Sequence, residues 1–331
     1  VLAGAGTSEV KAADKAKIGV LVADVSGEEA QGFRSYYENY IAGNYDVEFN
    51  YTDALQSAED EKKSIEKFAS LGCQAIISFS SNDRVQQIET CEKYGVDYAV
   101  ASGVLDDAQY ETYKTYEYFA GQVGPGNDTE FEAGKDMGAY YKEQGVSKVA
   151  IYGAFIPNPM HVYRVAGVLN GLGCTYGGES DMNAIAGQIF QDQTVDLSKV
   201  EGDVEVVSYL QGYGDTTTDE LNAAIQKTPD AFISVGMATT FFAQSLSEAG
   251  ISFSDIDSFT ETNGNSMKNG TLTYLAGKYS SSIGPVFALV MNAINGNVIR
   301  DEDGNAPSIS QGYLVATDSD TFDKYSVSDS G

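Results

Sequence analysis

The stretch KIGVLVADVSGEEAQGF, residues 17–33, sets a pattern that recurs along the chain. Apart from Lys17, its first seven residues are apolar and rich in β-branched side chains, which is typical of a buried strand. Gly27 then marks a loop, and the aromatic side chains that follow it, Phe33, Tyr36 and Tyr37, have helical spacing. Strands that are apolar throughout and alternate with helices indicate parallel sheets covered by helices on both faces. The stretch therefore predicts an α/β fold of the doubly wound type.

The alternation of strands and helices falls into two consecutive series and an irregular tail. The first series is predicted as strands 17–23, 47–51, 75–80 and 98–101 with helices 28–42, 58–71 and 83–94. The glycine-rich stretch GQVGPG (121–126) interrupts the pattern, and we interpret it as a hinge. The second series and the tail are predicted as strands 148–152, 204–210, 231–235, 271–275 and 312–316 with helices 129–143, 159–172, 218–227, 239–249 and 284–295. Two such series predict two lobes, and ligands of such sheets lie beyond the carboxyl ends of the strands.

Length and charge narrow the class of protein. The chain has 331 residues, which is more than most single domains contain. Its 20 Lys and Arg residues against 48 Asp and Glu residues give a net charge of −28, which repels nucleic acid and anionic membrane surfaces. The sequence has no apolar run of the roughly 18 residues that a membrane span needs. We therefore expect no nucleic acid partner, and a membrane contact only through a lipid anchor.

Thiol and imidazole side chains are few. The cysteines are Cys73, Cys91 and Cys174, and their odd number leaves at least one without a partner in the chain. A bridge between Cys73 and Cys91 and simple burial as small apolar side chains are both open. His161 is the only histidine and no cysteine spacing matches a metal site, so we expect no metal and no cofactor. Because no nucleophile elbow is present and a catalytic triad would have to recruit His161 alone, we expect no enzymatic activity.

The first eight residues, VLAGAGTS, resemble the end of a bacterial lipoprotein signal peptide. Such signals end in Leu-Ala-Gly-Cys, and Ala5 stands at the position of the lipid-accepting cysteine, so the chain as written cannot be lipidated there. Residues 1–16 would then be the flexible tether of an extracytoplasmic lipoprotein, at the cell surface or in the periplasm. The alternative is a start of small residues without that origin.

Three longer segments carry a resemblance to a known family. They are KIGVLVADVSGEEAQGF (17–33), SLGCQAIISFSSND (70–83) and VAIYGAFIPNPMHVYRVAGVLNGL (149–172). In their order and spacing the chain resembles, over residues 17–317, the type I periplasmic binding proteins, the ribose- and galactose-binding group that serves ABC transporters.

This resemblance implies a monomer with two lobes, in which the chain crosses between the lobes three times. We place the crossings near residues 121–126, near Lys278 and near residues 308–312. The expected lobes are 17–123 plus 279–310 and 124–278 plus 311–331.

The resemblance also implies a ligand site in the loops after the strands. The candidate residues are Asp24, Ser26, Phe33, Asn82, Asp83, Ser102, Phe155, His161, Arg164, Gly236, Glu261 and Lys278. Arg164 begins the stretch RVAG, and Arg-x-x-Gly is common at this point of the family, with the arginine reaching a ligand hydroxyl or carboxylate. A solvated helix face is the alternative place for Arg164, and packing in the core is the alternative role of Phe33 and Phe155.

The chain also departs from the family pattern at its expected ligand loops. Sugar binders of this group usually carry a charged pair where this chain has Ser102 and Gly103, and Asn-Asp where it has Gly236 and Met237. Glu261 and Lys278 could take over part of their role. These departures indicate a ligand other than a common monosaccharide, because sugar hydroxyls left unpaired in a buried site cost about 1 to 3 kcal/mol each.

The sequence thus predicts the solute-binding protein of an ABC importer, with a small polar ligand, a sugar or a sugar-like molecule, between the lobes. Its protein partner would be the membrane permease. Two alternatives stay open: a ligand sensor that signals to a membrane receptor, and a binder of a nucleoside or other non-sugar solute.

Overall fold

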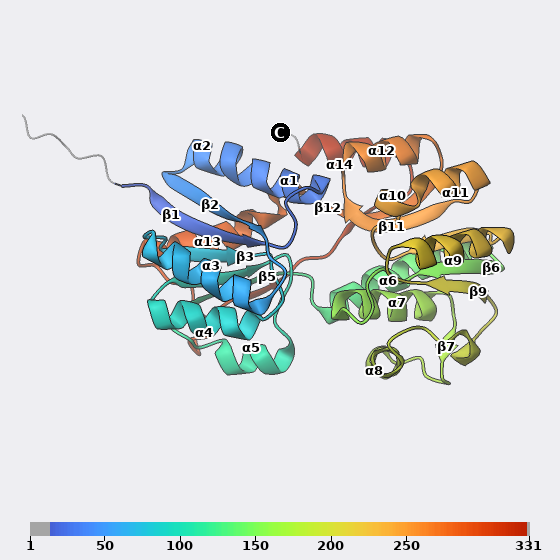
Figure 1. Ribbon diagram of the computed structural model, residues 1–331, viewed down its shortest axis with the longest axis horizontal. Coiled ribbons are helices and arrows are strands. Elements are labelled where there is room, and N and C mark those ends of the chain that lie inside the picture. The colour runs from blue at the N-terminus through green and yellow to red at the C-terminus, as the bar shows by residue number, and fades with distance from the viewer. Residues whose placement is uncertain (1–13, 330–331) are drawn as a thin grey trace, which may run out of the picture.

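Two six-stranded β-sheets form the centres of two lobes (Figure 1). The computed structural model describes residues 14–329. In the first lobe the strand order is β13-β5-β4-β3-β1-β2, and all neighbouring strands are parallel. These strands are β1 (Ala16–Val22), β2 (Val47–Ala54), β3 (Ala75–Ser78), β4 (Asp97–Ala101), β5 (Phe119–Gly124) and β13 (Ser308–Ser310). The helices of this lobe are α1 (Glu28–Ser35), α2 (Ala42–Asn44), α3 (Ala58–Ser70), α4 (Arg84–Tyr94), α5 (Asp107–Tyr113) and α13 (Gly284–Ile294). A π-helical stretch (Tyr36–Ile41) joins α1 to α2.

The second lobe repeats this plan with one antiparallel strand. Its strand order is β14-β12-β11-β10-β6-β9, and only β14 runs antiparallel to its neighbour. The strands are β6 (Lys148–Tyr152), β9 (Glu205–Leu210), β10 (Ala231–Ser234), β11 (Phe253–Ser258), β12 (Leu272–Lys278) and β14 (Leu314–Ala316). The helices are α6 (Asn127–Glu143), α7 (Pro159–Gly171), α8 (Met182–Asp192), α9 (Asp215–Gln226), α10 (Ala238–Phe241), α11 (Ala243–Ala249), α12 (Glu261–Lys268) and α14 (Ser319–Asp329). A small hairpin pairs β7 (Thr175–Tyr176) with β8 (Val200–Glu201).

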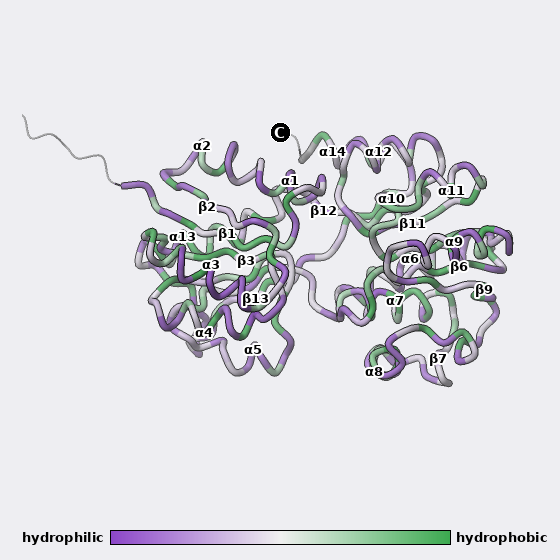
Figure 2. Tube along the Cα trace, in the orientation of Figure 1, coloured by the Kyte–Doolittle hydropathy of each residue, from purple (hydrophilic) through white to green (hydrophobic). Residues whose placement is uncertain are grey.

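Both faces of the first sheet are covered, as the apolar strands predict. Ile18 and Val20 of β1 pack in one hydrophobic cluster with side chains of α1 and α13, whereas Leu21 belongs to a second cluster with side chains of α3 and α4. This alternation follows from the period of two residues in a strand. Figure 2 shows hydrophobic residues concentrated in the strands of both sheets. The predicted doubly wound α/β architecture in two lobes is confirmed.

The chain passes between the two sheets three times. The first passage follows the end of β5 at Gly124 and leads into α6. The second leads from β12 through a short 3-10 helix (Ser280–Ile283) to α13, and the third joins β13 to β14. We call residues 125–126, 279–283 and 311–313 the crossing segments.

Several elements differ from the sequence prediction. The stretch interpreted as a hinge is largely strand: β5 includes Gly121, whose backbone (φ +133°) has no room for a side chain because a Cβ would lie 2.7 Å from the Pro307 carbonyl oxygen. The strand β11 was not recognised from its own apolar pattern, since Asp255 and Asp257 interrupt the run. The predicted helix 239–249 is divided at Phe242, and the predicted strand 312–316 is shortened to β14.

Helices α6 and α7 of the second lobe lie in direct backbone contact. A Cβ on Gly134 of α6 would lie 2.0 Å from the Arg164 carbonyl oxygen, and one on Gly167 of α7 would lie 2.0 Å from the Phe131 carbonyl oxygen. Gly138 and Gly171 repeat the arrangement one turn further along each helix. The two helices can approach this closely only because glycine occupies these positions.

The cysteines are buried and unpaired. Cys73 and Cys91 both lie in the cluster beneath α3 and α4, and Cys174 lies in the core of the second lobe. Of the two alternatives open for Cys73 and Cys91, the structure has simple burial. Among residues 14–329, no helix combines the length and the apolar character that crossing a membrane requires.

Candidate ligand-binding site

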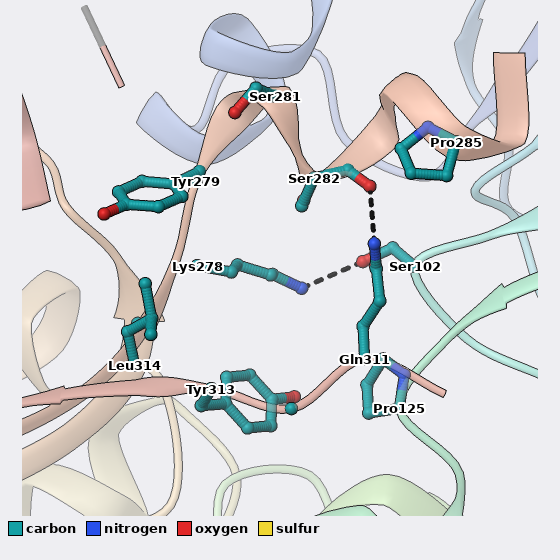
Figure 3. A pocket seen from close by; sticks show the side chains of 12 residues that line it. Ser102, Pro125, Lys278, Tyr279, Ser281, Ser282, Pro285, Gln311, Tyr313 and Leu314 are labelled. Carbon is teal, nitrogen blue, oxygen red and sulfur yellow. Dashed lines mark hydrogen bonds between the residues drawn. The ribbon is translucent and has the colours of Figure 1, made fainter. Parts of the chain in front are cut away.

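A cavity of about 320 Å³ lies between the lobes and is lined by all three crossing segments (Figure 3). Pro125 comes from the first segment, Ser281 from the second and Tyr313 from the third, while Ser102 follows β4 of the first lobe. Gln311 donates a hydrogen bond to the Ser282 carbonyl oxygen (2.8 Å) and so joins the second segment to the third. The cavity therefore lies where the two lobes are connected.

Lys278 extends into this cavity from the end of β12 (Figure 3). Its Nζ donates to Ser102 Oγ (2.9 Å) and lies 3.7 Å from the Glu29 carboxylate. The ammonium group also lies 5.8 Å from the ring centroid of Phe33 and 6.0 Å from that of Tyr313, within the range of cation–π attraction. Lys278 thus links the second lobe to the first.

Arg164 is part of a buried network in the second lobe. Its guanidinium donates to the Glu130 carboxylate (Nε to Oε2, 2.5 Å), to the Val235 carbonyl oxygen (2.9 Å) and to the Tyr313 hydroxyl (2.8 Å). Tyr313 in turn donates to Glu130 (2.7 Å). Burial alone would lower the pKa of Arg164, but the Glu130 carboxylate and Tyr313 raise it.

The environment of Arg164 rules out the solvated helix face, and its contact with a ligand stays a prediction. Arg164 is 5% exposed, and four of its five N–H groups have protein partners, the fourth being a bond of 3.3 Å from Nη2 to Glu130. It therefore neither lies on a solvated face nor extends freely into the cleft. Its partners place it directly behind Tyr313 of the cavity wall.

His161 and Gly236 lie beside Arg164. A Cβ atom on Gly236 would lie 3.6 Å from Arg164 Nη1 and 3.6 Å from His161 Nε2. His161 is buried, and burial together with the positive charge of Arg164 lowers its pKa to about 3. The imidazole is therefore neutral at physiological pH.

Aromatic side chains are exposed at the same edge of the second lobe. Phe155, which follows β6, is 42% exposed and contacts Phe241 edge to face with centroids 6.4 Å apart. Phe241 is stacked at 4.1 Å on Tyr213, which follows β9 and is 66% exposed. Phe33 of the first lobe is instead buried and stacked on Phe79. Of these aromatic side chains, the exposed ones therefore belong to the second lobe.

Backbone strain concentrates at the strand ends that face the other lobe. Ser102 (φ +55°), Ala154 (φ +53°) and Met237 (φ +69°) have left-handed conformations that non-glycine residues rarely adopt. They follow β4, β6 and β10, respectively. Such conformations cost about 1 to 3 kcal/mol each and cluster at functional sites.

Asp24 and Ser26 form the turn that precedes α1. The Asp24 carboxylate accepts hydrogen bonds from the main-chain nitrogens of Ser26 (2.9 Å) and Gly27 (3.2 Å). Burial tends to raise the pKa of Asp24, but these hydrogen bonds lower it below its usual value. Both side chains are exposed, and the hydrogen bonds that they make join residues of this turn.

Asn82 and Asp83 are held by a buried carboxylate that the sequence did not reveal. Glu61 of α3 accepts hydrogen bonds from Ser80 Oγ (2.5 Å), Asn82 Nδ2 (3.1 Å) and the main-chain nitrogen of Asp83 (3.0 Å). Asp83 itself caps α4 by accepting from Gln86 N (2.9 Å). The structure thus assigns both residues a local role in the loop after β3.

Glu261 is exposed in the first turn of α12, beside a contact between the lobes. There Glu28 accepts a hydrogen bond from Thr262, and Glu29 accepts one from Ser258 Oγ (2.5 Å). We call these four residues, two from α1 and two from the second lobe, the interlobe clasp. A second cavity of about 290 Å³ borders it.

The structure therefore brings the candidate residues into two groups. Ser102 and Lys278 line the cavity, with the buried Phe33 ring 5.8 Å from the Lys278 ammonium group. Phe155, His161, Arg164 and Gly236 lie together at the facing edge of the second lobe. Glu130, Tyr313, Phe241 and Tyr213 complete these groups and were not predicted. Only Tyr213 could have been found from the sequence, because an aromatic residue between two glycines indicates an exposed turn. The roles of Glu130, Tyr313 and Phe241 depend on partners that are distant in the chain.

The chain matches no protein-family model and no curated protein. Among solved structures, it is similar to a periplasmic solute-binding protein of an ABC transporter from Actinobacillus succinogenes 130z with bound D-allose, with 16% identity, a TM-score of 0.70 and coverage of 94% of this chain and 100% of that one. A solute-binding protein from Bacillus halodurans C-125 with bound myo-inositol has 16% identity, a TM-score of 0.67 and coverage of 96% and 99%. The arabinose-binding component from Shewanella sp. ANA-3 has 15% identity, a TM-score of 0.66 and coverage of 94% and 95%.

These matches define the class of fold. The chain has the type I periplasmic binding protein fold, with two α/β lobes joined by three crossing segments. At 15 to 16% identity the likeness is one of fold.

Proposed function

We propose that the protein is the extracytoplasmic solute-binding component of an ABC importer and binds an uncharged sugar or sugar-like molecule between its lobes. The observation that carries this proposal is the convergence of strand ends from both lobes on one cavity, bridged by Lys278 and Ser102. In sheets of this type, ligands bind beyond the carboxyl ends of the strands. The permease partner and the monomeric state belong to the same proposal.

The charges around the cavity favour an uncharged ligand. Arg164 is paired with Glu130, and Lys278 lies 3.7 Å from Glu29, so each cation has a neighbouring carboxylate. Hydroxyl and amide groups of Ser102, Gln311 and Tyr313 provide neutral donors and acceptors. The exposed rings of the second lobe supply the flat apolar surface that the C–H face of a sugar requires.

Ligand binding would be coupled to the relative position of the lobes. A ligand that touches both lobes stabilises the arrangement in which both contacts are made, and the crossing segments absorb the rotation. The permease would recognise that arrangement. We infer binding without turnover.

A nucleoside is a second candidate ligand. The stacked pair of Tyr213 and Phe241 exposes a flat aromatic face on which a base could stack. An amphipathic ligand of this kind would direct its base to the second lobe and its ribose to the cavity.

Thermal unfolding with D-allose, myo-inositol, L-arabinose and adenosine at millimolar concentration tests the proposal. A compound at 100 times its dissociation constant stabilises the folded state by about 2.7 kcal/mol, which raises the melting temperature by about 5 °C. Lys278→Met should reduce this shift, and Lys268→Met on the exposed face of α12 serves as the matched control. A melting temperature unchanged by all four compounds would contradict a sugar- or nucleoside-binding role.

Membrane attachment is a separate part of the proposal. Ala5 and the tether up to residue 13 lie outside the described residues, and the resemblance of residues 1–8 to a lipoprotein signal supports an anchor. Ala5→Cys, expressed with an upstream signal segment, should move the protein to the membrane fraction. Continued release would rule out the lipoprotein interpretation and leave the binding proposal intact.

A further inference from the structure

Two hydroxyl groups of the second lobe donate hydrogen bonds to two carboxylates of the first lobe in the interlobe clasp. Ser258 Oγ donates to Glu29 Oε2 (2.5 Å), and Thr262 Oγ1 donates to the Glu28 carboxylate. Ser258 is the last residue of β11 and Thr262 lies in the first turn of α12, whereas both glutamates lie in the first turn of α1. Hydrogen bonds to an ionised acceptor are roughly twice as strong as neutral ones. The clasp therefore joins the lobes by direct protein contacts of the stronger kind.

The Glu29 carboxylate contacts a second side chain of the second lobe. While its Oε2 atom accepts a hydrogen bond from Ser258, its Oε1 atom lies 3.7 Å from Lys278 Nζ. The side chains of Glu29 and Lys278 are 32% and 17% exposed, so solvent screens this pair less than a fully exposed one. Both oxygens of one first-lobe carboxylate are thus engaged by the second lobe. A rotation of the lobes that moves α1 away from β11 would break both contacts.

Helix α1 lies at the border between the lobes (Figure 1) and is fixed against the second crossing segment. A Cβ on Gly32 would lie 2.9 Å from Ser280 Oγ, so the helix and this segment are in close contact. The hydroxyl of Tyr37, in the π-helical stretch after α1, donates a hydrogen bond to the Ile283 carbonyl oxygen (2.8 Å) of the same segment. The helix dipole also favours carboxylates in the first turn. The two carboxylates of the clasp are therefore held in place by the first lobe and the crossing segment.

The four residues of the clasp, all in the described part of the chain, are separate from the residues that line the 320 Å³ cavity. We propose that the clasp is a latch that stabilises the arrangement of the two lobes seen in this structure, independently of any ligand in that cavity. Because its hydrogen bonds run directly between the lobes, they favour this arrangement over any in which the lobes have rotated apart. A ligand that binds to the same arrangement would then bind more tightly, and this consequence rests on the proposed function.

Small-angle X-ray scattering of the free protein tests the latch. The double variant Ser258→Ala with Thr262→Val removes both hydroxyl donors and keeps the carboxylates. Its radius of gyration should exceed that of the native protein by about 1 Å, on a value of about 20 Å for a compact chain of this length, because the lobes separate more often. An unchanged circular dichroism spectrum separates this movement from unfolding.

A matched pair of substitutions away from the clasp provides the control. Ser247→Ala with Thr112→Val, on exposed faces of α11 and α5, removes the same two kinds of hydroxyl and should leave the radius of gyration unchanged. Thr262→Ser keeps the donor and should retain the native value. Equal radii for the native protein and the double variant at the clasp would overturn the latch.

Sugar affinity measures the latch through the ligand. Loss of the two hydrogen bonds should raise the dissociation constant about tenfold for whichever of D-allose, myo-inositol and L-arabinose binds the native protein. If the radius of gyration increases in the double variant although none of the three sugars binds, the latch stands and the proposed function is wrong. If a sugar binds both proteins equally and their radii are equal as well, the proposed function stands and the latch is wrong.

Discussion

Arg164 and Glu130 form the most deeply buried ion pair among the described residues, with side chains 6% and 3% exposed. The sequence marked Arg164 through its Arg-x-x-Gly motif but gave no sign of its partners. Glu130 lies 34 positions away on another helix, and Tyr313 lies 149 positions away on a crossing segment. A candidate residue can thus be recognised from local sequence, whereas its role depends on contacts that only the fold creates.

The buried pair leads to a prediction about stability. Arg164→Met should lower the free energy of unfolding by about 3 to 5 kcal/mol, because it leaves the Glu130 carboxylate buried without its counter-charge. The double variant Arg164→Met with Glu130→Met should recover a large part of this loss. Urea unfolding monitored by circular dichroism measures both values.

An exposed pair provides the control for this prediction. Lys63 and Glu59 lie one turn apart on α3 with side chains 66% and 63% exposed. Lys63→Met should change the free energy of unfolding by less than about 0.5 kcal/mol. Equal effects at the two sites would mean that burial does not determine the strength of the Arg164 pair.

At the scale of elements, the contact between α6 and α7 explains the glycine of the Arg-x-x-Gly motif. Gly167 is required because the carbonyl oxygen of Phe131 occupies the place of its side chain, 2.0 Å from an ideal Cβ. The motif therefore combines the packing of two helices with the position of Arg164 one turn earlier. The same stretch of chain therefore determines both the helix packing and the position of the buried Arg164 network.

Alanine substitutions distinguish tight from open glycines. Gly134→Ala and Gly167→Ala should each lower the free energy of unfolding by about 1 to 3 kcal/mol or more, since the clash is with backbone atoms that cannot rotate away. Gly187→Ala in α8 has open space around it and should raise that free energy by about 0.5 to 1 kcal/mol, as expected for alanine in a helix. Chemical denaturation of the three variants tests the contrast, and a stable Gly167→Ala protein would contradict the close approach of α6 and α7.

The elements that were predicted and those that were missed differ in a physical way. Strands such as β1, β6 and β10 are apolar over most of their length and were recognised as buried. β5 and β11 were not recognised from their own patterns, because glycines in one and aspartates in the other break the apolar run. The buried Asp255 is accommodated by hydrogen bonds from Thr239 N (2.9 Å) and Ser234 Oγ (3.3 Å), which no periodicity reveals.

At the scale of the whole molecule, the interlobe clasp brings Glu29 of the first lobe close to Asp257, the neighbour of Ser258 in the second lobe. Burial, then the negative charges of Asp255 and Glu29, raise the pKa of Asp257 above its usual value. Asn263 Nδ2 donates a hydrogen bond to Asp257 (3.0 Å), and Lys278 Nζ lies 3.7 Å from the Glu29 carboxylate. Protonated Asp257 is therefore favoured in the folded protein more than in the unfolded chain.

This difference predicts how stability depends on pH. The folded state binds the Asp257 proton more tightly than the unfolded chain does. The contribution of this proton to the free energy of unfolding is therefore complete at acidic pH and is lost as pH rises through the raised pKa. The free energy of unfolding should fall between about pH 5 and about pH 8 by roughly 1 to 2 kcal/mol more in the native protein than in Asp257→Asn. Urea unfolding at the two pH values measures the difference.

The matched control for this pH dependence lies on the exposed surface of α9. Asp219→Asn removes one carboxylate without touching the clasp and should retain the pH dependence of the native protein. If Asp257→Asn also retains the pH dependence of the native protein, protonation of Asp257 does not determine how the free energy of unfolding changes with pH.

The contacts that connect the lobes could not be predicted from the sequence. Alternating strands and helices predicted two lobes, but Lys278 and Ser102 are 176 positions apart, and Glu29 and Ser258 are 229 positions apart. Such pairs depend on how the three crossing segments place the two lobes against each other. The hydrophobic pattern of a helix or strand describes only that element.

The three buried thiols have a practical consequence for measuring lobe movement. Burial raises the pKa of Cys73 to about 11 and also raises the pKa values of Cys91 and Cys174, so none of the three should react readily with maleimide reagents. A single cysteine introduced on each lobe could then carry a fluorescent dye without removing any native thiol. Energy transfer between the two dyes would then report directly whether the distance between the lobes changes when a sugar is added.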